Sequence, residues 1–108
     1  MQGFQVTFYT KQDRRQAGKP MAEWLLDLAK GLGIQGATTV VGSEGFGHHH
    51  RLHTRRFFEL AEQPVEVMMA VSAIEIQQLF LSLREADVQL FYVVSAVEFG
   101  TTGIDDIY

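Results

Sequence analysis

Two kinds of hydrophobic periodicity alternate along the chain, and their order constrains the fold more than any other feature. Residues 4–10 alternate apolar and polar side chains, as a strand with one buried face does. Residues 21–32 place apolar side chains three and four residues apart, which is typical of an amphipathic helix. Strand patterns recur over 36–44, over 57–60 with 65–71, and over 90–99. A second helical stripe lies before the last of these strands. The order β-α-β-β-α-β predicts an α/β (α+β) ferredoxin-like fold, with one antiparallel four-stranded sheet and both helices on one face.

Short local signals mark the ends of these elements. Pro20 suits the start of the first helix, because the first N–H groups of a helix have no partner within it. Gly33 follows that stripe and supplies a stop. Ser72 and Glu75 have the spacing of a capping box, which predicts the start of the second helix. Pro64 cannot donate to a strand ladder, so we expect the third strand to be broken or bulged there.

Length and composition exclude several classes of protein. With 108 residues and 12.2 kDa, a single domain over 1–108 is expected. The chain has no cysteine, which excludes disulfides, thiol catalysis and cysteine-bound zinc. Its apolar runs stay well short of the about 20 residues that cross a bilayer, and no signal peptide is evident, so we expect a cytoplasmic protein. A formal net charge of -4 argues against general nucleic-acid binding.

The sheet face without helices is expected to be too apolar for a small monomer. On the strand phases read from the sequence, this face would carry Tyr9, Met68, Tyr92 and Val94. A large exposed apolar patch is usually an interaction surface. Self-association would cover it.

Positive charge is concentrated in two short segments of this acidic chain. Of the nine Lys and Arg residues, four lie between residues 11 and 19 and three between 51 and 56. A long loop over about 45–56 starts with Gly45, Phe46 and Gly47, and such glycines let successive N–H groups point at an anion. Charge-assisted bonds to phosphate oxygens would come from Arg14, Arg15, Lys19, Arg51, Arg55 and Arg56. The alternative is a solvated loop whose charges only aid solubility.

The same loop supports a second hypothesis, a metal-responsive binding protein. Imidazole is a favoured ligand for zinc, nickel and copper, and the loop holds all four histidines of the chain, His48, His49, His50 and His53. No acidic residue lies between 45 and 58 to complete a site, so no metal ligand is assigned and metal binding by the loop stays open.

An enzyme is the third hypothesis, and it has the least support. Asp13 and Glu23 are candidate acids or bases beside the first basic segment. Pairing with neighbouring Arg and Lys side chains, or capping of the first helix, is the simpler interpretation. We therefore predict no catalytic residue, no enzymatic activity and no covalent cofactor.

Six segments, spread over nearly the whole chain, resemble a known family: Lys11-Gln-Asp-Arg-Arg, Gly18-Lys-Pro-Met-Ala-Glu-Trp-Leu, Ile34-Gln-Gly-Ala-Thr, Glu44-Gly-Phe-Gly-His, Phe57-Phe-Glu-Leu and Gln63-Pro-Val-Glu-Val. The family is PII-like and is catalogued as the domain of unknown function number one-ninety. The resemblance implies a ferredoxin-like fold assembled as a trimer, with nucleotide clefts between subunits as in the PII nitrogen-regulatory signalling proteins.

The resemblance also implies a regulatory function. PII proteins carry Gly-Phe-Gly at the base of a regulatory loop that contacts nucleotide, and Gly45-Phe46-Gly47 stands at the equivalent place. Taken together with the basic clusters described above, this predicts the nucleotide-binding residues Gly45, Phe46, Gly47, His48, Arg14, Arg15, Lys19, Arg55 and Arg56. A membrane transporter or channel, or another regulated protein, is the implied partner of the loop tip.

Two departures from the PII pattern narrow the expected ligand. His49 stands where classical PII proteins have a glutamine near Mg-ATP. Arg84-Glu85-Ala86-Asp87 replaces the Gly-Asp-Gly-Lys phosphate loop that precedes their last strand. We therefore expect an adenine nucleotide, with AMP or ADP favoured over Mg-ATP, and no sensing of 2-oxoglutarate.

Overall fold

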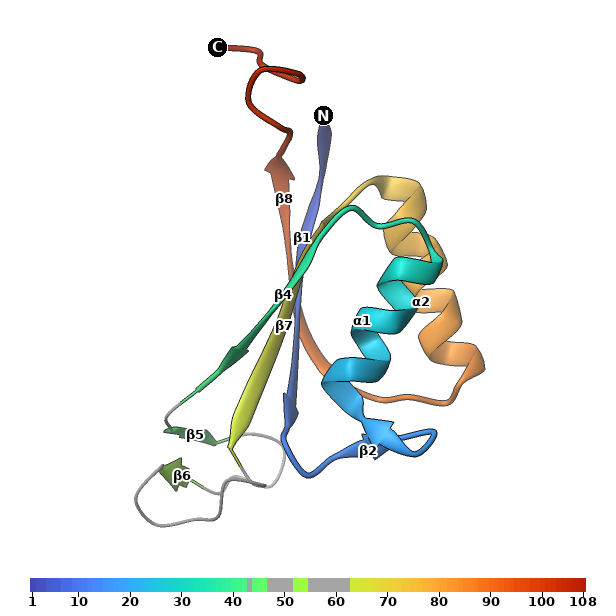
Figure 1. Ribbon diagram of the computed structural model, residues 1–108, viewed down its shortest axis with the longest axis vertical. Coiled ribbons are helices and arrows are strands. Elements are labelled where there is room, and N and C mark those ends of the chain that lie inside the picture. The colour runs from blue at the N-terminus through green and yellow to red at the C-terminus, as the bar shows by residue number, and fades with distance from the viewer. Residues whose placement is uncertain (43, 47–51, 55–62) are drawn as a thin grey trace.

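Four long strands form one antiparallel sheet, and two helices cover one face of it (Figure 1). The computed structural model describes residues 1–42, 44–46, 52–54 and 63–108, with 44–46 and 52–54 described by their backbone alone. The sheet order is β4-β7-β1-β8. The elements are β1 (Gln2–Lys11), α1 (Met21–Gly31), β4 (Ala37–Val41), β7 (Pro64–Val71), α2 (Ala73–Glu85) and β8 (Phe91–Glu98). The predicted ferredoxin-like fold is confirmed.

The core lies between the helices and the two central strands. Val6 and Phe8 of β1 alternate with outward side chains, and Val67 of β7 lies on the same face. Leu25 of α1 and Leu79 of α2 close the core from the helix side, and all five side chains are fully buried. Each such burial contributes about 1.5–3 kcal/mol, so the apolar spacing read from the sequence is the main source of the fold's stability.

The two helices start in different ways. At α2 the Ser72 hydroxyl accepts a bond from the Glu75 N–H at 3.1 Å, and the Glu75 carboxylate accepts one from the Ser72 N–H at 2.8 Å, which confirms the predicted capping box. At α1, Pro20 is the cap residue rather than part of the first turn, and the helix begins at Met21. The reason is that Pro20 still pairs with Arg15 in a short strand ladder.

Pro64 begins the described part of the third strand, so the predicted break before it stays a prediction. β7 runs without interruption from this proline, whose carbonyl accepts a bond from the Gly42 N–H at 2.7 Å. The first position of a strand tolerates proline because no ladder donor is needed there. The strand signal over residues 57–60 lies outside the described residues.

Two short hairpins were not predicted. One pairs β2 (Arg15–Gln16) with β3 (Lys19–Pro20) and turns through Ala17 and Gly18, both with positive φ, 51° and 81°. The other pairs β5 (Glu44–Phe46) with β6 (Leu52–Thr54), within the segment expected to be a loop. Strands of two or three residues are too short to show a hydrophobic period, so the sequence pattern could not reveal them.

The sheet face predicted for Tyr92 and Val94 of the last strand is wrong. In the β8 register Tyr92 pairs with Phe8 and Val94 with Val6, so both lie on the helix face, and the Tyr92 ring packs 4.8 Å from that of Phe80. Phe91 instead lies on the helix-free face, with its ring 5.5 Å from that of Tyr9. Four consecutive apolar residues have no alternation, so the strand phase could not be read from them.

The helix-free face is nevertheless apolar, as expected. From the ladders, its side chains include Tyr9, Val40, Met68, Ala70, Phe91, Val93 and Val97. Phe91, Val93 and Val40 are exposed. Within the residues described, no helix combines the length and apolar character needed to span a membrane.

Candidate anion-binding site

The first basic segment folds into the β2–β3 hairpin, which lies against the start of α1. The Met21 N–H donates to the Arg14 carbonyl at 2.8 Å, which fastens the hairpin to the first residue of the helix. The turn at Ala17 and Gly18 connects its two short strands, in which Arg15 pairs with Pro20 and Lys19 pairs with Gln16. Among the described residues, no heavy atom lies within 4 Å of the position that a Cβ would take at Gly18. The geometry leaves the hairpin accessible to a ligand.

Each cation of this hairpin already has a partner. The Arg14 guanidinium donates to the Gln89 carbonyl at 2.5 Å, and this bond ties the hairpin to the connection between α2 and β8. The Arg15 guanidinium donates to the Gly18 carbonyl at 2.8 Å, within the turn. Lys19 Nζ lies 2.7 Å from an Asp27 carboxylate oxygen. These contacts hold three positive charges at one end of the molecule without neutralising Arg14 or Arg15.

The Lys19–Asp27 pair shifts the titration of both groups. The hydrogen bond from Lys19 and the attraction of its charge lower the pKa of Asp27. The same contact with Asp27 raises the pKa of Lys19. Both side chains are partly exposed, and exposed pairs are weak because water and salt screen them. An anion that approaches Lys19 would therefore compete with Asp27 at little cost.

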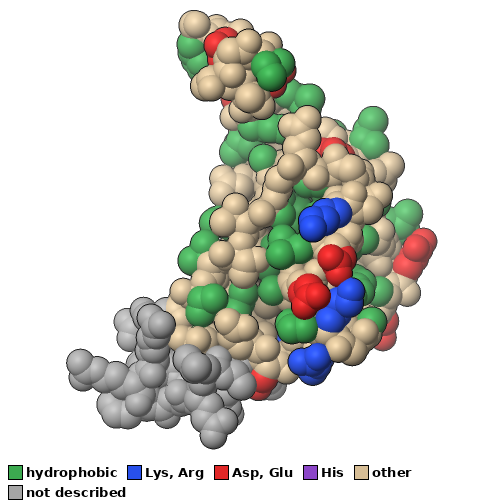
Figure 2. Space-filling model, in the orientation of Figure 1, with side chains coloured by type: hydrophobic (Ala, Val, Ile, Leu, Met, Phe, Trp, Pro, Cys, Tyr) green, Lys and Arg blue, Asp and Glu red, His purple; other side chains and the backbone are tan. Residues whose placement is uncertain are grey.

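Acidic side chains also surround the hairpin, so the charge pattern is local. Figure 2 shows Lys and Arg side chains interspersed with Asp and Glu on the viewed face, rather than one uniform positive surface. The ion pair of Lys19 is with Asp27, whereas the sequence had suggested Asp13 or Glu23 as partners of the basic residues. The pairing with Asp27 brings together a residue two positions before the helix and a residue on its second turn, and no sequence signal indicates it.

The second basic segment is described only in part. Gly45 and Phe46 lie on β5, where their backbones pair with His53 and Leu52 of β6. Both short hairpins lie at the same end of the molecule (Figure 1). The other predicted residues lie outside the described residues: Gly47, His48, His49, His50, Arg51, Arg55 and Arg56. The predicted contact between the two basic segments stays a prediction.

Two buried polar atoms near this end were missed by the sequence analysis. Thr10 Oγ1 and Gln63 Nε2 have no hydrogen-bond partner among the described residues, although both side chains are more than nine-tenths buried. They come from neighbouring ends of β1 and the chain before β7, where the Gln12 N–H donates to the Gln63 carbonyl at 3.0 Å. Buried polar groups normally have hydrogen-bond partners, so these two atoms need a polar group from outside the described residues.

The metal hypothesis gains no support from the described part of the chain. Among residues 1–42 and 63–108, no three His, Asp or Glu side chains are grouped to hold a metal ion. The side chains of the four histidines are not described, so the metal hypothesis for the 45–56 loop stays open.

The structure has the fold of PII-like proteins. It is similar to CPII, a nitrogen regulatory PII-like protein from Thiomonas intermedia K12 bound to ADP, AMP and bicarbonate, with a TM-score of 0.65, 14% identity, and coverage of 94% of this chain and 96% of that one. The apo form of CPII gives a TM-score of 0.62 at 14% identity, covering 94% and 95% of the two chains. A putative PII-like signaling protein from Thermus thermophilus gives 0.65 at 18% identity, covering 90% and 88%.

The family is also established. Residues 3–99 match the family described as Uncharacterized ACR, the domain of unknown function number one-ninety, and the chain belongs to that family. The resemblance found in the sequence is thereby confirmed. No curated protein matches this chain.

Proposed function

We propose that this protein is a PII-like regulator, not an enzyme, that binds an adenine nucleotide between subunits of a homotrimer. The observation that carries the proposal is the shared PII-like fold over 94% of the chain with a protein that was solved bound to ADP and AMP. The β2–β3 hairpin adds support, because Arg14, Arg15 and Lys19 supply positive charge at the end of the molecule where the 45–56 segment begins. Phosphate oxygens are the natural partners of such charges.

Nucleotide binding regulates a partner only if it favours one state of the 45–56 loop over another. A ligand shifts such an equilibrium by its difference in affinity for the two states, and by no more. Phosphate contacts from Arg55 and Arg56 to a nucleotide held by the hairpin would provide this difference, because these contacts would form in only one of the two loop states. Partner choice then follows the state of the loop.

Calorimetric titration of the oligomer with AMP, ADP, ATP and a cyclic nucleotide, each with and without magnesium, tests the proposal. We expect saturable binding near one nucleotide per subunit, strongest for AMP or ADP. The double substitution Arg55→Ala/Arg56→Ala should weaken binding about tenfold or more, because charge-assisted bonds are the strong ones. It should also change the protection of the loop from proteolysis.

Lys30→Ala is the matched control, because Lys30 lies in the last turn of α1, far along the helix from the hairpin. Its nucleotide affinity should equal that of the wild type. Absence of saturable heat across the whole panel contradicts the proposal. So does an Arg55→Ala/Arg56→Ala variant with wild-type affinity and wild-type proteolysis.

A further inference from the structure

Residues after β8 form a hydrogen-bonded bend that projects beyond the end of the sheet (Figure 1). The Thr101 N–H donates to the Asp105 carboxylate at 2.9 Å, and the Asp105 N–H donates back to the Thr101 carbonyl at 2.9 Å. The Gly103 N–H donates to the Asp106 carboxylate at 2.9 Å, and the Ile104 N–H donates to the Thr101 carbonyl at 3.1 Å. The bend over 101–106 is therefore preformed, although most of its surface is exposed.

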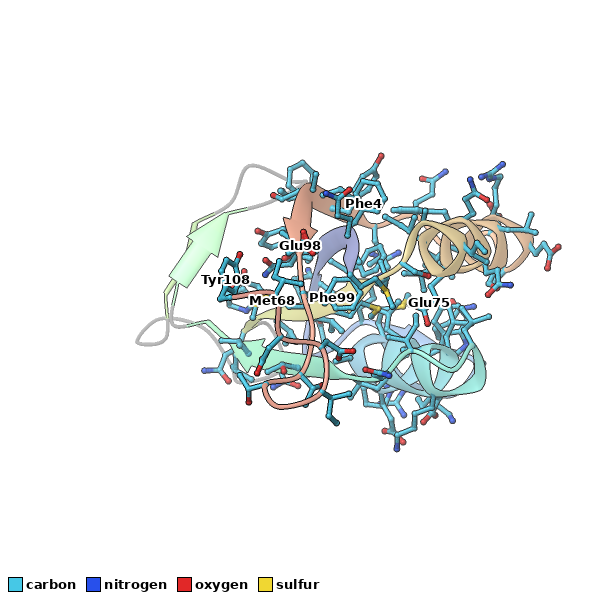
Figure 3. The ribbon with its side chains drawn as sticks, turned by 90° about the horizontal axis from the view of Figure 1, so that it is seen from above. Phe4, Met68, Glu75, Glu98, Phe99 and Tyr108 are labelled. Atoms are coloured by element: carbon cyan, nitrogen blue, oxygen red, sulfur yellow. The ribbon has the colours of Figure 1, made fainter. Side chains whose placement is uncertain are left out.

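This bend displays apolar side chains to solvent. Ile104 is 80% exposed and Ile107 is 63% exposed, and Tyr108 beside them has no cover. Figure 3 shows Tyr108 on the same side of the sheet as Met68, which is the side without helices. The projecting segment therefore exposes apolar side chains on the same side of the molecule as the apolar sheet face, and exposed apolar surface of this kind marks an interaction site.

A groove on the helix-free face lies at the same end of the sheet. It has a volume of about 470 Å³ and is lined by Gln5, Gly36, Thr38, Met68, Met69, Ala70, Val97, Glu98 and Phe99. The lining combines apolar side chains with a few polar ones, as sites for an apolar side chain do. No heavy atom of the described part of the chain lies within 4 Å of the Cβ position of Gly36 at the groove's rim.

The segment does not fill the groove of its own chain. Ile104 and Ile107 are not among its lining residues, and both side chains are exposed. The four hydrogen bonds join residues within 101–106, so the bend would keep its shape on docking into the groove of a second copy. A segment already fixed in its bound shape also loses little conformational entropy on binding.

We propose that residues 104–108 of one copy dock into the Thr38–Met68–Val97 groove of the next copy. The inference rests on the proposed self-association through the helix-free face. The contact is head-to-tail, with different surfaces on the two partners, and such contacts satisfy every copy when they close into a ring. Each copy then uses its projecting segment once and its groove once.

Directed disulfide formation between two different variants tests the docking. Because the chain has no native cysteine, only the introduced cysteines can form a disulfide. One variant carries Ile107→Cys and the other Thr38→Cys, and the two are mixed and exposed to a mild oxidant. We expect a mixed disulfide between the two chains. The control partner is Thr39→Cys, because Thr39 neighbours Thr38 on the opposite face of β4. Since a disulfide needs close Cβ atoms, the Thr38→Cys mixture should give about tenfold more product.

Sedimentation separates the failure of this inference from the failure of the proposed assembly. Ile104→Ser/Ile107→Ser should self-associate about tenfold more weakly than the wild type, while Ile74→Ser, which changes an exposed isoleucine on α2, should not. Equal disulfide yields from the Thr38→Cys and Thr39→Cys mixtures overturn the docking even if the wild type is oligomeric. A wild type that sediments as a monomer overturns the docking and the assembly together.

Discussion

At the scale of single residues, the turn of the basic hairpin contains an alanine in a backbone region that alanine disfavours. Ala17 has φ of 51° and precedes Gly18 at 81°, so both central residues of this two-residue turn are left-handed. Asparagine tolerates this region far better, and such turns favour Asn-Gly. We expect Ala17→Asn to stabilise the protein by about 0.5–1 kcal/mol, measured from the urea midpoint. Ala86→Asn is the control, because Ala86 has φ of -84° and should gain nothing. An equal gain at both positions would contradict this explanation.

The Lys19–Asp27 pair makes a prediction about pH. The pKa of Asp27 in the fold lies below its ordinary value of 3.8, so the stability that Asp27 contributes is present above pH 3.8 and is lost as pH falls through the folded value. The pKa of Lys19 lies above 10.5, so its contribution is present below pH 10.5 and is lost as pH rises through the folded value. In Lys19→Met the pKa of Asp27, followed by NMR, should return toward 3.8. Lys30→Met should raise it less, because Lys30 contributes a smaller attraction. Equal shifts in the two variants would refute the assignment to Lys19.

At the scale of elements, the capping box of α2 should contribute measurably to stability. Ser72→Ala removes the acceptor for the Glu75 N–H, a bond of 3.1 Å, and leaves that donor at the helix start without its partner. The expected loss is about 1 kcal/mol, seen as a lower urea midpoint with an unchanged slope. Ser82→Ala is the matched control, since that hydroxyl only bonds back to the Gln78 carbonyl within the helix. Loss of the Ser82 bond should cost nothing, because alanine is the better helix former.

Elements with a local signal can be predicted from the sequence, and elements that depend on tertiary contacts cannot. The capping box and the stripes around Leu25 and Leu79 are local, because periodicity and caps act within a few residues, and the structure confirms them. The sheet face on which Tyr92 lies has no local signal, because the apolar run around it does not alternate. Only the pairing with Phe8 determines this face.

The same distinction applies to the candidate site. The cations of the β2–β3 hairpin are visible in the sequence as a basic cluster, so the segment itself could be identified. Their partners could not, because Asp27 and the Gln89 carbonyl reach Lys19 and Arg14 only through the packing of α1 and of the α2–β8 connection. The nucleotide-binding assignment stays a prediction for the whole set: Gly45, Phe46, Gly47, His48, Arg14, Arg15, Lys19, Arg55 and Arg56.

At the scale of the whole molecule, the helix-free face should decide the oligomeric state. Met68 lies near the middle of this face, between Thr38 of β4 and Thr7 of β1 in the ladders. Met68→Glu would place a carboxylate against a neighbouring copy, and a buried charge without a partner costs several kcal/mol. The variant should therefore sediment as a monomer.

The fold should survive this substitution, because Met68 points away from the core that holds Val67 and Met69. Circular dichroism should match that of the wild type. Leu81→Glu is the control: Leu81 is also an exposed apolar side chain, but it lies on α2, on the other side of the sheet, so its oligomeric state should be unchanged. If Met68→Glu and Leu81→Glu both sediment like the wild type, the helix-free face is not the interface. If both dissociate, the helices take part in the assembly and the proposed trimer needs a different geometry.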